Sequence, residues 1–324
     1  MTRRLLVATL PLIATVAAAQ SSTPPRRAHH SLVYDESGER VLLTGGSTPV
    51  DSGRSFVFFN DTWAFDGKRW TKLGEAGQRL SGARLAYDTK QNRLLSLGGY
   101  SDGRSLPHLR AFDGKDWLTT GAHPESGTAE PGFVYDSRRD RFVAFGGSAG
   151  RGSTLGSTWE LAGTTWTRFA GESPPGRQAH AMVFDSKRNR IVVFGGIGAG
   201  VPGQPAPRLG DTWEFDGTTW TEKKVTGPGP RATAGAAFDS KRGIVVVFGG
   251  DNAQGFLGDT WSWDGSTWKK LSETGPEPRG MGYLAYDKVR DRIVLFGGRK
   301  GWPDGDLNDT WEWDGASWRP TLLQ

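Results

Sequence analysis

A Gly-Gly pair that occurs six times is the feature that most constrains the fold of this chain. The pairs lie 48 to 54 residues apart, at positions 45–46, 98–99, 146–147, 195–196, 249–250 and 297–298. An apolar run such as IVVF or VVVF precedes each pair, and an aromatic residue followed by Asp precedes each run. Self-similarity at this period indicates a repeat architecture in which each unit packs against its neighbours.

The second half of each unit also repeats. A Thr-Trp step followed by an aromatic residue and Asp-Gly occurs in most units, as in DTWEFDG, and every unit closes on a tryptophan. Thirteen of the 14 tryptophans fit this pattern, and only Trp302 falls outside it. The high tryptophan content is therefore a property of the repeat, and these rings are expected to fill the layers between units.

Each unit has the pattern of four short strands. The first carries the aromatic-Asp step, and the second is the apolar run that ends in Gly-Gly. The third alternates, as in Trp213-Glu214-Phe215, which places its aromatic side chains on one face. An Asp-Gly turn then returns the chain into the fourth strand.

The unit resembles the kelch repeat, whose pattern runs from an Arg and often a His, through an aromatic residue and Gly-Gly, to a closing Trp. Pro175-Gly176-Arg177-Gln178-Ala179-His180, Gly195-Gly196 and Trp220 match it in full. The resemblance implies an all-β, six-bladed β-propeller of kelch-type four-stranded blades, similar to the central domain of galactose oxidase. The expected blades are 26–73, 79–120, 128–170, 177–224, 231–271 and 279–322. No split blade is evident, and how blades one and six join stays open.

The first residues have the anatomy of a secretory signal peptide. Arg3 and Arg4 precede an apolar run over 5–16, and three alanines end at Ala19. We expect cleavage after Ala19, leaving a propeller over 20–324 that is exported to the periplasm or the cell exterior. The apolar run is too short for a membrane span. The chain has no Cys, which excludes disulfides, thiolate metal sites and a lipoprotein anchor.

The connections that follow Gly-Gly are long, at 47–60, 100–108, 148–156, 197–210, 251–258 and 299–308. The other turns within a blade are short. Long loops on a rigid scaffold usually carry binding, so the long-loop face is the expected functional face. Phe56, Phe58 and Phe59 lie in the first loop, either as core or as an exposed patch. The short-turn face is basic, with a cross-turn pair expected between Asp185 and Arg190.

Four arginines begin the repeats on the long-loop face. With two histidines three residues further on, they form the candidate ligand-binding set Arg27, His30, Arg177, His180, Arg231 and Arg279. Clustered guanidinium groups suit anions, such as an acidic sugar or a carboxylate-bearing peptide. The alternative is that these arginines belong to the repeat and bond carbonyls of neighbouring blades. Blades two and three lack the arginine and offer His123, Glu125 and Glu130 nearby.

Trp302 is the other candidate ligand-binding residue, because a loop tryptophan can stack on a sugar ring or anchor a partner. Packing over the adjacent blade is the alternative. Asp304, Asp306 and Asn308 have the alternating spacing of calcium loops but lack the Gly and Glu that complete such a loop. Neither a metal nor a cofactor is predicted.

Three functions are consistent with these features. The favoured one is a monomeric binding scaffold whose ligand is an anionic glycan or a protein. An enzyme similar to the six-bladed sugar mutarotases is an alternative, with Arg177, His180 and Glu125 at the channel mouth. A structural component of the cell envelope is the third. Copper-radical chemistry is excluded because its cofactor needs a Cys, and nucleic-acid binding is not expected.

Overall fold

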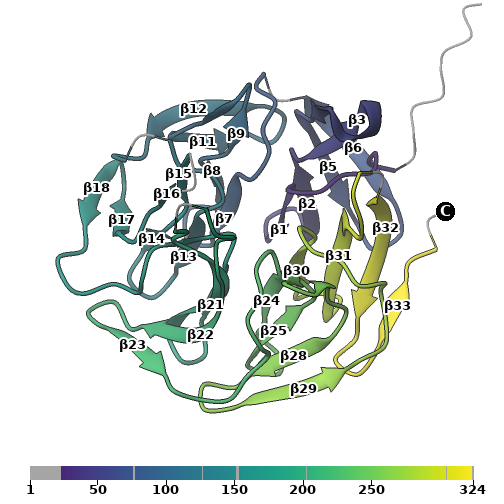
Figure 1. Ribbon diagram of the computed structural model, residues 1–324. Helices are drawn as coiled ribbons and strands as arrows, with labels where there is room; N and C mark the ends of the chain where they lie inside the picture. Colours follow the sequence, from purple (N-terminus) through teal and green to yellow (C-terminus); the bar gives the residue numbers. More distant parts are fainter. Residues whose placement is uncertain are drawn as a thin grey trace, which may run out of the picture.

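Six four-stranded antiparallel sheets surround a central axis in the computed structural model (Figure 1). The structure describes residues 23–75, 77–125, 127–150, 153–201, 203–303 and 305–322. The expectation of an all-β, six-bladed propeller is confirmed. The predicted signal peptide lies outside the described residues. None of the described segments forms a helix of the length and apolarity needed to cross a bilayer.

Every blade is built from one continuous stretch of chain, with its first strand nearest the axis. Blade one consists of β1 (Ser31–Asp35), β2 (Arg40–Thr44), β5 (Asp61–Phe65) and β6 (Trp70–Glu75). Blade two consists of β7 (Arg84–Asp88), β8 (Arg93–Leu97), β11 (His108–Phe112) and β12 (Trp117–Ala122). Blade three consists of β13 (Gly132–Asp136), β14 (Arg141–Phe145), β17 (Thr158–Ala162) and β18 (Thr165–Arg168).

The other three blades follow the same order. Blade four consists of β20 (Ala181–Asp185), β21 (Arg190–Gly198), β22 (Arg208–Phe215) and β23 (Trp220–Lys223), with β19 (Arg177–Gln178) added beside β21. Blade five consists of β24 (Gly235–Asp239), β25 (Ile244–Phe248), β28 (Thr260–Trp263) and β29 (Trp268–Ser272). Blade six consists of β30 (Tyr283–Asp287), β31 (Arg292–Arg299), β32 (Asp306–Trp313) and β33 (Trp318–Pro320).

The long connections after Gly-Gly are partly ordered as strands rather than as plain loops. Four of them contain a two-stranded hairpin: β3 (Ser47–Val50) with β4 (Ser55–Phe58), β9 (Tyr100–Ser101) with β10 (Arg104–Ser105), β15 (Ser148–Gly150) with β16 (Ser153–Thr154), and β26 (Asp251–Asn252) with β27 (Gly255–Phe256). A 3-10 turn, η1 (Asp51–Gly53), joins β3 to β4. In blades four and six, the second and third strands extend into this region instead.

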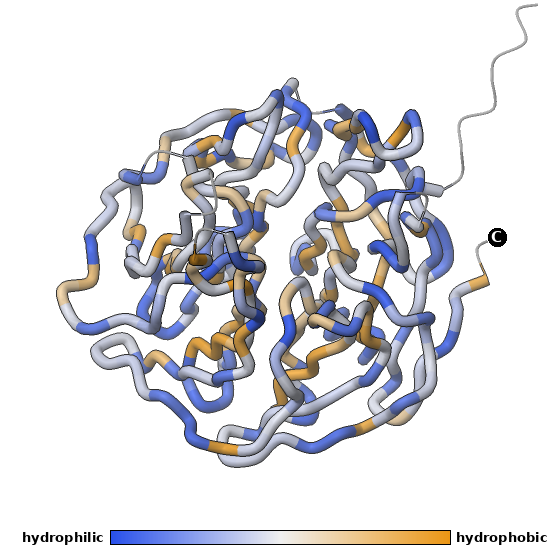
Figure 2. The backbone as a smooth tube through the Cα atoms, in the orientation of Figure 1, coloured by the Kyte–Doolittle hydropathy of each residue, from blue (hydrophilic) through white to orange (hydrophobic). Residues whose placement is uncertain are grey.

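The apolar core lies between blades. Val247, Trp263 and Trp268 of blade five pack on Val192 and Phe194 of blade four, for example. The hydropathy colouring shows apolar residues on the inner strands and polar residues at the turns (Figure 2). The Gly-Gly pairs allow blades to come close. A Cβ on Gly195 would lie 2.5 Å from the carbonyl oxygen of Arg231 in the next blade, so only glycine fits there.

The closing tryptophans of five blades join each of those blades to the one before it. Their indole N–H groups donate to a buried Thr hydroxyl on the third strand of the preceding blade, in the pairs Trp117–Thr62, Trp220–Thr158, Trp268–Thr212 and Trp318–Thr260. Trp70 donates to Thr310 at 2.9 Å, so blade one joins blade six by the same contact. The ring therefore closes without a split blade.

Candidate functional site

The four repeat arginines are buried and ion-paired. Arg27 donates both terminal nitrogens to the carboxylate of Asp61, at 2.6 and 2.8 Å, and one of them also to the carbonyl oxygen of Gly45 at 2.9 Å. The equivalent pairs are Arg177–Asp211, Arg231–Asp259 and Arg279–Asp309. The predicted arc of ligand-binding arginines is thus a set of internal ion pairs. The guanidinium groups bond carbonyls of their own blade, not of a neighbour.

The two candidate histidines are buried as well. Burial, and then the charge of the adjacent repeat arginine, holds the pKa of His30 and of His180 well below 6.5. His30 packs edge-on against Tyr283 and Phe296. His180 packs against Phe145, and neither of its ring nitrogens has a hydrogen-bond partner in the described chain. Both rings are therefore neutral at physiological pH.

A closed ring of six backbone hydrogen bonds narrows the long-loop end of the channel. Each blade supplies one residue, with positive φ, whose N–H donates to the equivalent carbonyl of the preceding blade at 2.8 to 3.1 Å. The six residues are His29, Gly82, Glu130, Ala179, Thr233 and Met281. Such φ values are uncommon outside glycine and are maintained only where the surroundings fix the backbone. We call these residues the amide ring.

Two side-chain contacts lie at the amide ring, and each skips a blade. His29 Nδ1 lies 2.5 Å from Glu130 Oε1. This contact passes over Gly82, where a Cβ would meet the Glu130 side chain. Arg84 donates to the hydroxyl of Tyr283 at 2.7 Å and lies over its ring. Burial raises the pKa of Glu130, but the contact with His29 and the nearby Arg84 guanidinium outweigh this and lower the pKa overall.

The channel beneath the ring encloses a cavity of about 510 Å³ between the first strands of all six blades. The end of the cavity nearest the amide ring, which we call its inner end, is lined by Arg84, His180 and Tyr283. Its lining continues along apolar residues to the first residues of the short turns, including Ser137, Ser186 and Ser240. None of the amide-ring residues lines it. This cavity thus extends toward the short-turn face, whereas binding was expected on the opposite face.

An exposed row of aromatic rings crosses the long-loop face. Trp302 of blade six lies 5.7 Å from Phe56 of blade one, Phe56 lies 6.3 Å from Phe58, and Phe58 lies 6.1 Å from Tyr100 of blade two, as ring centroids. Trp302 is 59% exposed, Phe56 42% and Tyr100 39%. We call these four residues the aromatic row. Phe56 therefore belongs to an exposed patch rather than to the core. Phe59 instead packs beneath the guanidinium of Arg27, 4.0 Å away.

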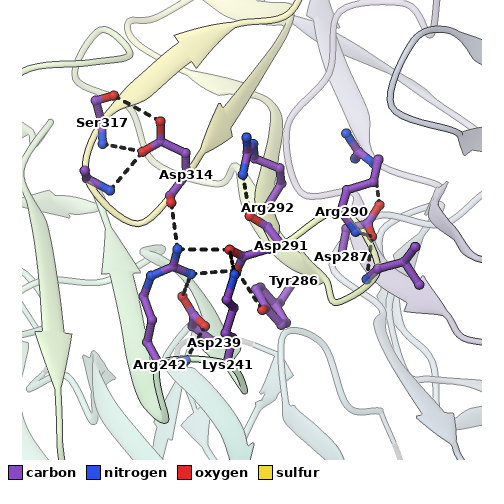
Figure 3. A network of polar contacts seen from close by, with 12 residues as sticks. Asp239, Lys241, Arg242, Tyr286, Asp287, Arg290, Asp291, Arg292, Asp314 and Ser317 are labelled. Atoms are coloured by element: carbon purple, nitrogen blue, oxygen red, sulfur yellow. Dashed lines mark hydrogen bonds and ion pairs between the residues drawn. The ribbon is translucent and has the colours of Figure 1, made fainter.

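The short-turn face carries networks of ion pairs. In Figure 3, Arg242 of blade five bonds Asp239 of its own turn, and Asp291 and the Asp314 carbonyl of blade six. The hydrogen bonds to Arg242 lower the pKa of Asp291. Arg40 and Arg93 pair with an Asp five residues earlier, as the repeat predicts. The predicted Asp185–Arg190 pair is wrong, since Asp185 pairs with Arg188.

Comparison with known proteins identifies the family. The description "KLHDC2/KLHL20/DRC7 Kelch-repeats domain" matches residues 134–319, more than half of the chain. The chain belongs to the kelch-repeat family. A solved structure titled "Structure of YjhT" aligns with a TM-score of 0.69 over 92% of this chain and 98% of that one. At 15% identity, that likeness concerns the kelch fold alone. No curated protein matches the sequence.

Within the described residues, no hydrogen bond or ion pair links the expected enzyme residues Arg177, His180 and Glu125. Arg177 is held by Asp211, and Glu125 accepts hydrogen bonds from Ser157. His123 is buried and packs edge-on against Trp159 and Trp166. Asp306 pairs with Arg299, so it is not free for calcium, and Asp304 lies outside the described residues. The described residues contain no group of acidic and His side chains fit for a metal.

Sequence reasoning missed His29, Arg84 and Tyr283, which lie at the inner end of the channel. A signal for two of them was present. The first residues of the innermost strands are Ser31, Arg84, Gly132, Ala181, Gly235 and Tyr283, so a large side chain is unusual at this repeat position. Comparing the blades position by position, instead of looking for what they share, singles out Arg84 and Tyr283.

Proposed function

We propose that this protein is an exported, monomeric carbohydrate-binding propeller that holds a glycan chain on its aromatic row. The observation that carries the proposal is the unbroken succession of four rings, three exposed and the Phe58 ring half-buried, across blades six, one and two. The C–H faces of sugar rings pack on aromatic faces, and tilted rings arranged in a line suit an extended ligand. The signal-peptide pattern of the first residues supports export.

The size of the row favours a glycan over a protein. Fully buried aromatic side chains contribute about 150–250 Å² each, so four partly exposed rings offer about 500 Å² at most. A stable protein interface needs about 800 Å² per partner. The row is also flanked by exposed polar groups suited to sugar hydroxyls, including Asp51, Ser52, Asp102 and Arg104.

The ligand need not be anionic. The arginines that suggested an acidic ligand are occupied by Asp side chains within the protein. Stacking on the row requires no charge from the sugar. We therefore expect neutral and acidic glycans to bind through the same rings, with charge as a secondary influence.

A glycan array followed by calorimetry on the best ligand tests the proposal. Trp302→Ala and Phe56→Ala should each weaken binding about 10- to 100-fold, since a buried aromatic contact contributes about 1.5–3 kcal/mol. Leu118→Ala is the matched control, because Leu118 is an equally exposed apolar side chain that lies on β12, outside the row. Unchanged affinity in Trp302→Ala would refute the proposal. An array without ligands, together with a pull-down that enriches one protein through the row, would assign a protein partner instead. Failure of both assays would favour a structural role.

A further inference from the structure

Arg84 differs from the other buried or half-buried arginines of the innermost layer because it has no carboxylate partner. Within the described chain, no Asp or Glu oxygen lies within 4.0 Å of its guanidinium. Its hydrogen bonds go to the hydroxyl of Tyr283 and the carbonyl of Ala83, both neutral acceptors. The nearby Glu130 is held by His29. A positive charge is therefore left without an ion pair in the lining of the channel.

The fold does not require a cation at this position. The equivalent residues of the other blades are Ser, Gly, Ala, Gly and Tyr. The repeat arginines provide the contrast, because each has an Asp at a fixed place in the same blade. Taking a charge partly out of water costs free energy unless a partner compensates it, so an unpaired guanidinium in a cavity indicates a site for an anion.

His180 is a second group at the inner end that lacks a partner. Its side chain is buried, at 4% exposure, lines the same cavity, and has both ring nitrogens without a hydrogen bond in the described chain. Buried polar atoms are normally satisfied. A neutral imidazole can donate one N–H to a ligand oxygen, and Arg84 has further N–H groups to donate.

The shape of the cavity limits what can fill it. Its volume of about 510 Å³ falls in the range of small-molecule sites. The walls between its two ends are largely apolar, with Val33, Met182 and Leu284 among them. At the short-turn end, the only two charged residues of the lining, Glu36 and Lys288, pair with each other. A bare inorganic anion would leave these walls without contacts.

We propose that the channel is a second binding site, for a small carboxylic acid with an apolar body. The carboxylate lies on the Arg84 guanidinium beside the Tyr283 hydroxyl, and the apolar body extends along the walls toward the short turns. The ligand enters from the short-turn face, because the cavity lining reaches the short turns and includes no residue of the amide ring. This site is separate from the aromatic row and does not depend on it.

Fluorine NMR titration of the full chain with 4-fluorobenzoate tests the site, with the neutral 4-fluorobenzamide as a matched probe. We expect the benzoate to bind at least ten-fold more tightly, as a charge-assisted hydrogen bond contributes about 1.5–3 kcal/mol. Arg84→Met should remove this preference, and Tyr283→Phe should weaken it two- to ten-fold. Arg168→Met, which removes an exposed arginine on the outer strand β18, should leave it unchanged.

A further variant tests the route of entry. Ser186→Trp places a large ring at the short-turn end of the cavity and should abolish benzoate binding without changing the melting temperature. If the benzoate keeps its full affinity in this variant, the proposed entrance is wrong. If wild-type protein fails to bind the benzoate, or binds both probes equally, the proposed site is wrong. Tyr283→Phe keeps the test valid if Arg84→Met fails to fold, because it removes one hydroxyl only.

Discussion

Blades one, four, five and six differ from blades two and three at the same two positions. The first group has a buried arginine before the first strand and its Asp partner before the third-strand Thr. In blade two these positions hold Leu80 and His108, and in blade three Thr128 and Ser157. Arginine and Asp are thus present together or absent together. The pair is a structural unit of the blade, and a ligand site must be sought elsewhere.

The two divergent blades also supply two of the unusual groups near the amide ring. The junction between them lacks the Trp–Thr contact, because Leu109 stands where other blades have Thr. Yet Arg84 comes from blade two and Glu130 from blade three. Departures from a local rule tend to mark functional sites in proteins that otherwise obey it. The divergent blades therefore contribute Arg84 and Glu130, while the regular blades contribute Tyr283 and His180 to the same end of the channel.

Breaking a repeat ion pair should have the largest effect on stability. Arg177→Leu copies the residue type of blade two but leaves Asp211 without its partner. We expect a loss of about 3–5 kcal/mol in the free energy of unfolding, as for other broken buried pairs. Urea denaturation measures this loss.

Two further variants sharpen that comparison. In the double variant Arg177→Leu with Asp211→Asn, both charges are absent, as in blades two and three, so the loss should be smaller than for Arg177→Leu alone. Arg208→Leu breaks a more exposed pair with Asp251 and should cost about 1 kcal/mol or less. Equal losses for all three variants would contradict the structural role assigned to the repeat pair.

The closing tryptophans allow a smaller test of the same contrast. The indole N–H of Trp220 donates to the buried Thr158, whereas the indole N–H of Trp166 has no hydrogen-bond partner among the described residues. Replacing each by Phe keeps an aromatic ring, so Trp220→Phe should cost about 1–2 kcal/mol more than Trp166→Phe. The two melting temperatures report the difference. Equal shifts would show that the indole N–H contributes little to the joining of blades.

The sequence was sufficient for the fold because the fold is periodic. Six Gly-Gly pairs and six closing tryptophans repeat the same local information, which fixed the blade order and strand pattern.

The site was harder to predict. The partners of Arg27 and Arg177 lie 34 residues away, so sequence inspection alone does not show that these arginines are occupied. The Arg84–Tyr283 contact joins residues almost 200 positions apart and exists only once the ring closes. The exposed position of Phe56 depends on the β3–β4 hairpin.

The last effect, and the most specific, concerns acid. His30 and His180 occupy the same repeat position in blades one and four, where blades two and three have Ala83 and Pro131. Both have a pKa well below 6.5 in the folded state.

Between pH 6.5 and the folded pKa, the unfolded chain binds more protons than the folded chain, so the free energy of unfolding decreases as the pH falls. Each buried ring should contribute a decline of about 1.4 kcal/mol per pH unit once the pH lies well below 6.5. Urea denaturation at pH 7 and pH 5 should therefore show a smaller acid loss in His180→Phe than in wild type. If His180→Phe loses as much stability as wild type over this range, His180 does not remain neutral in the folded protein.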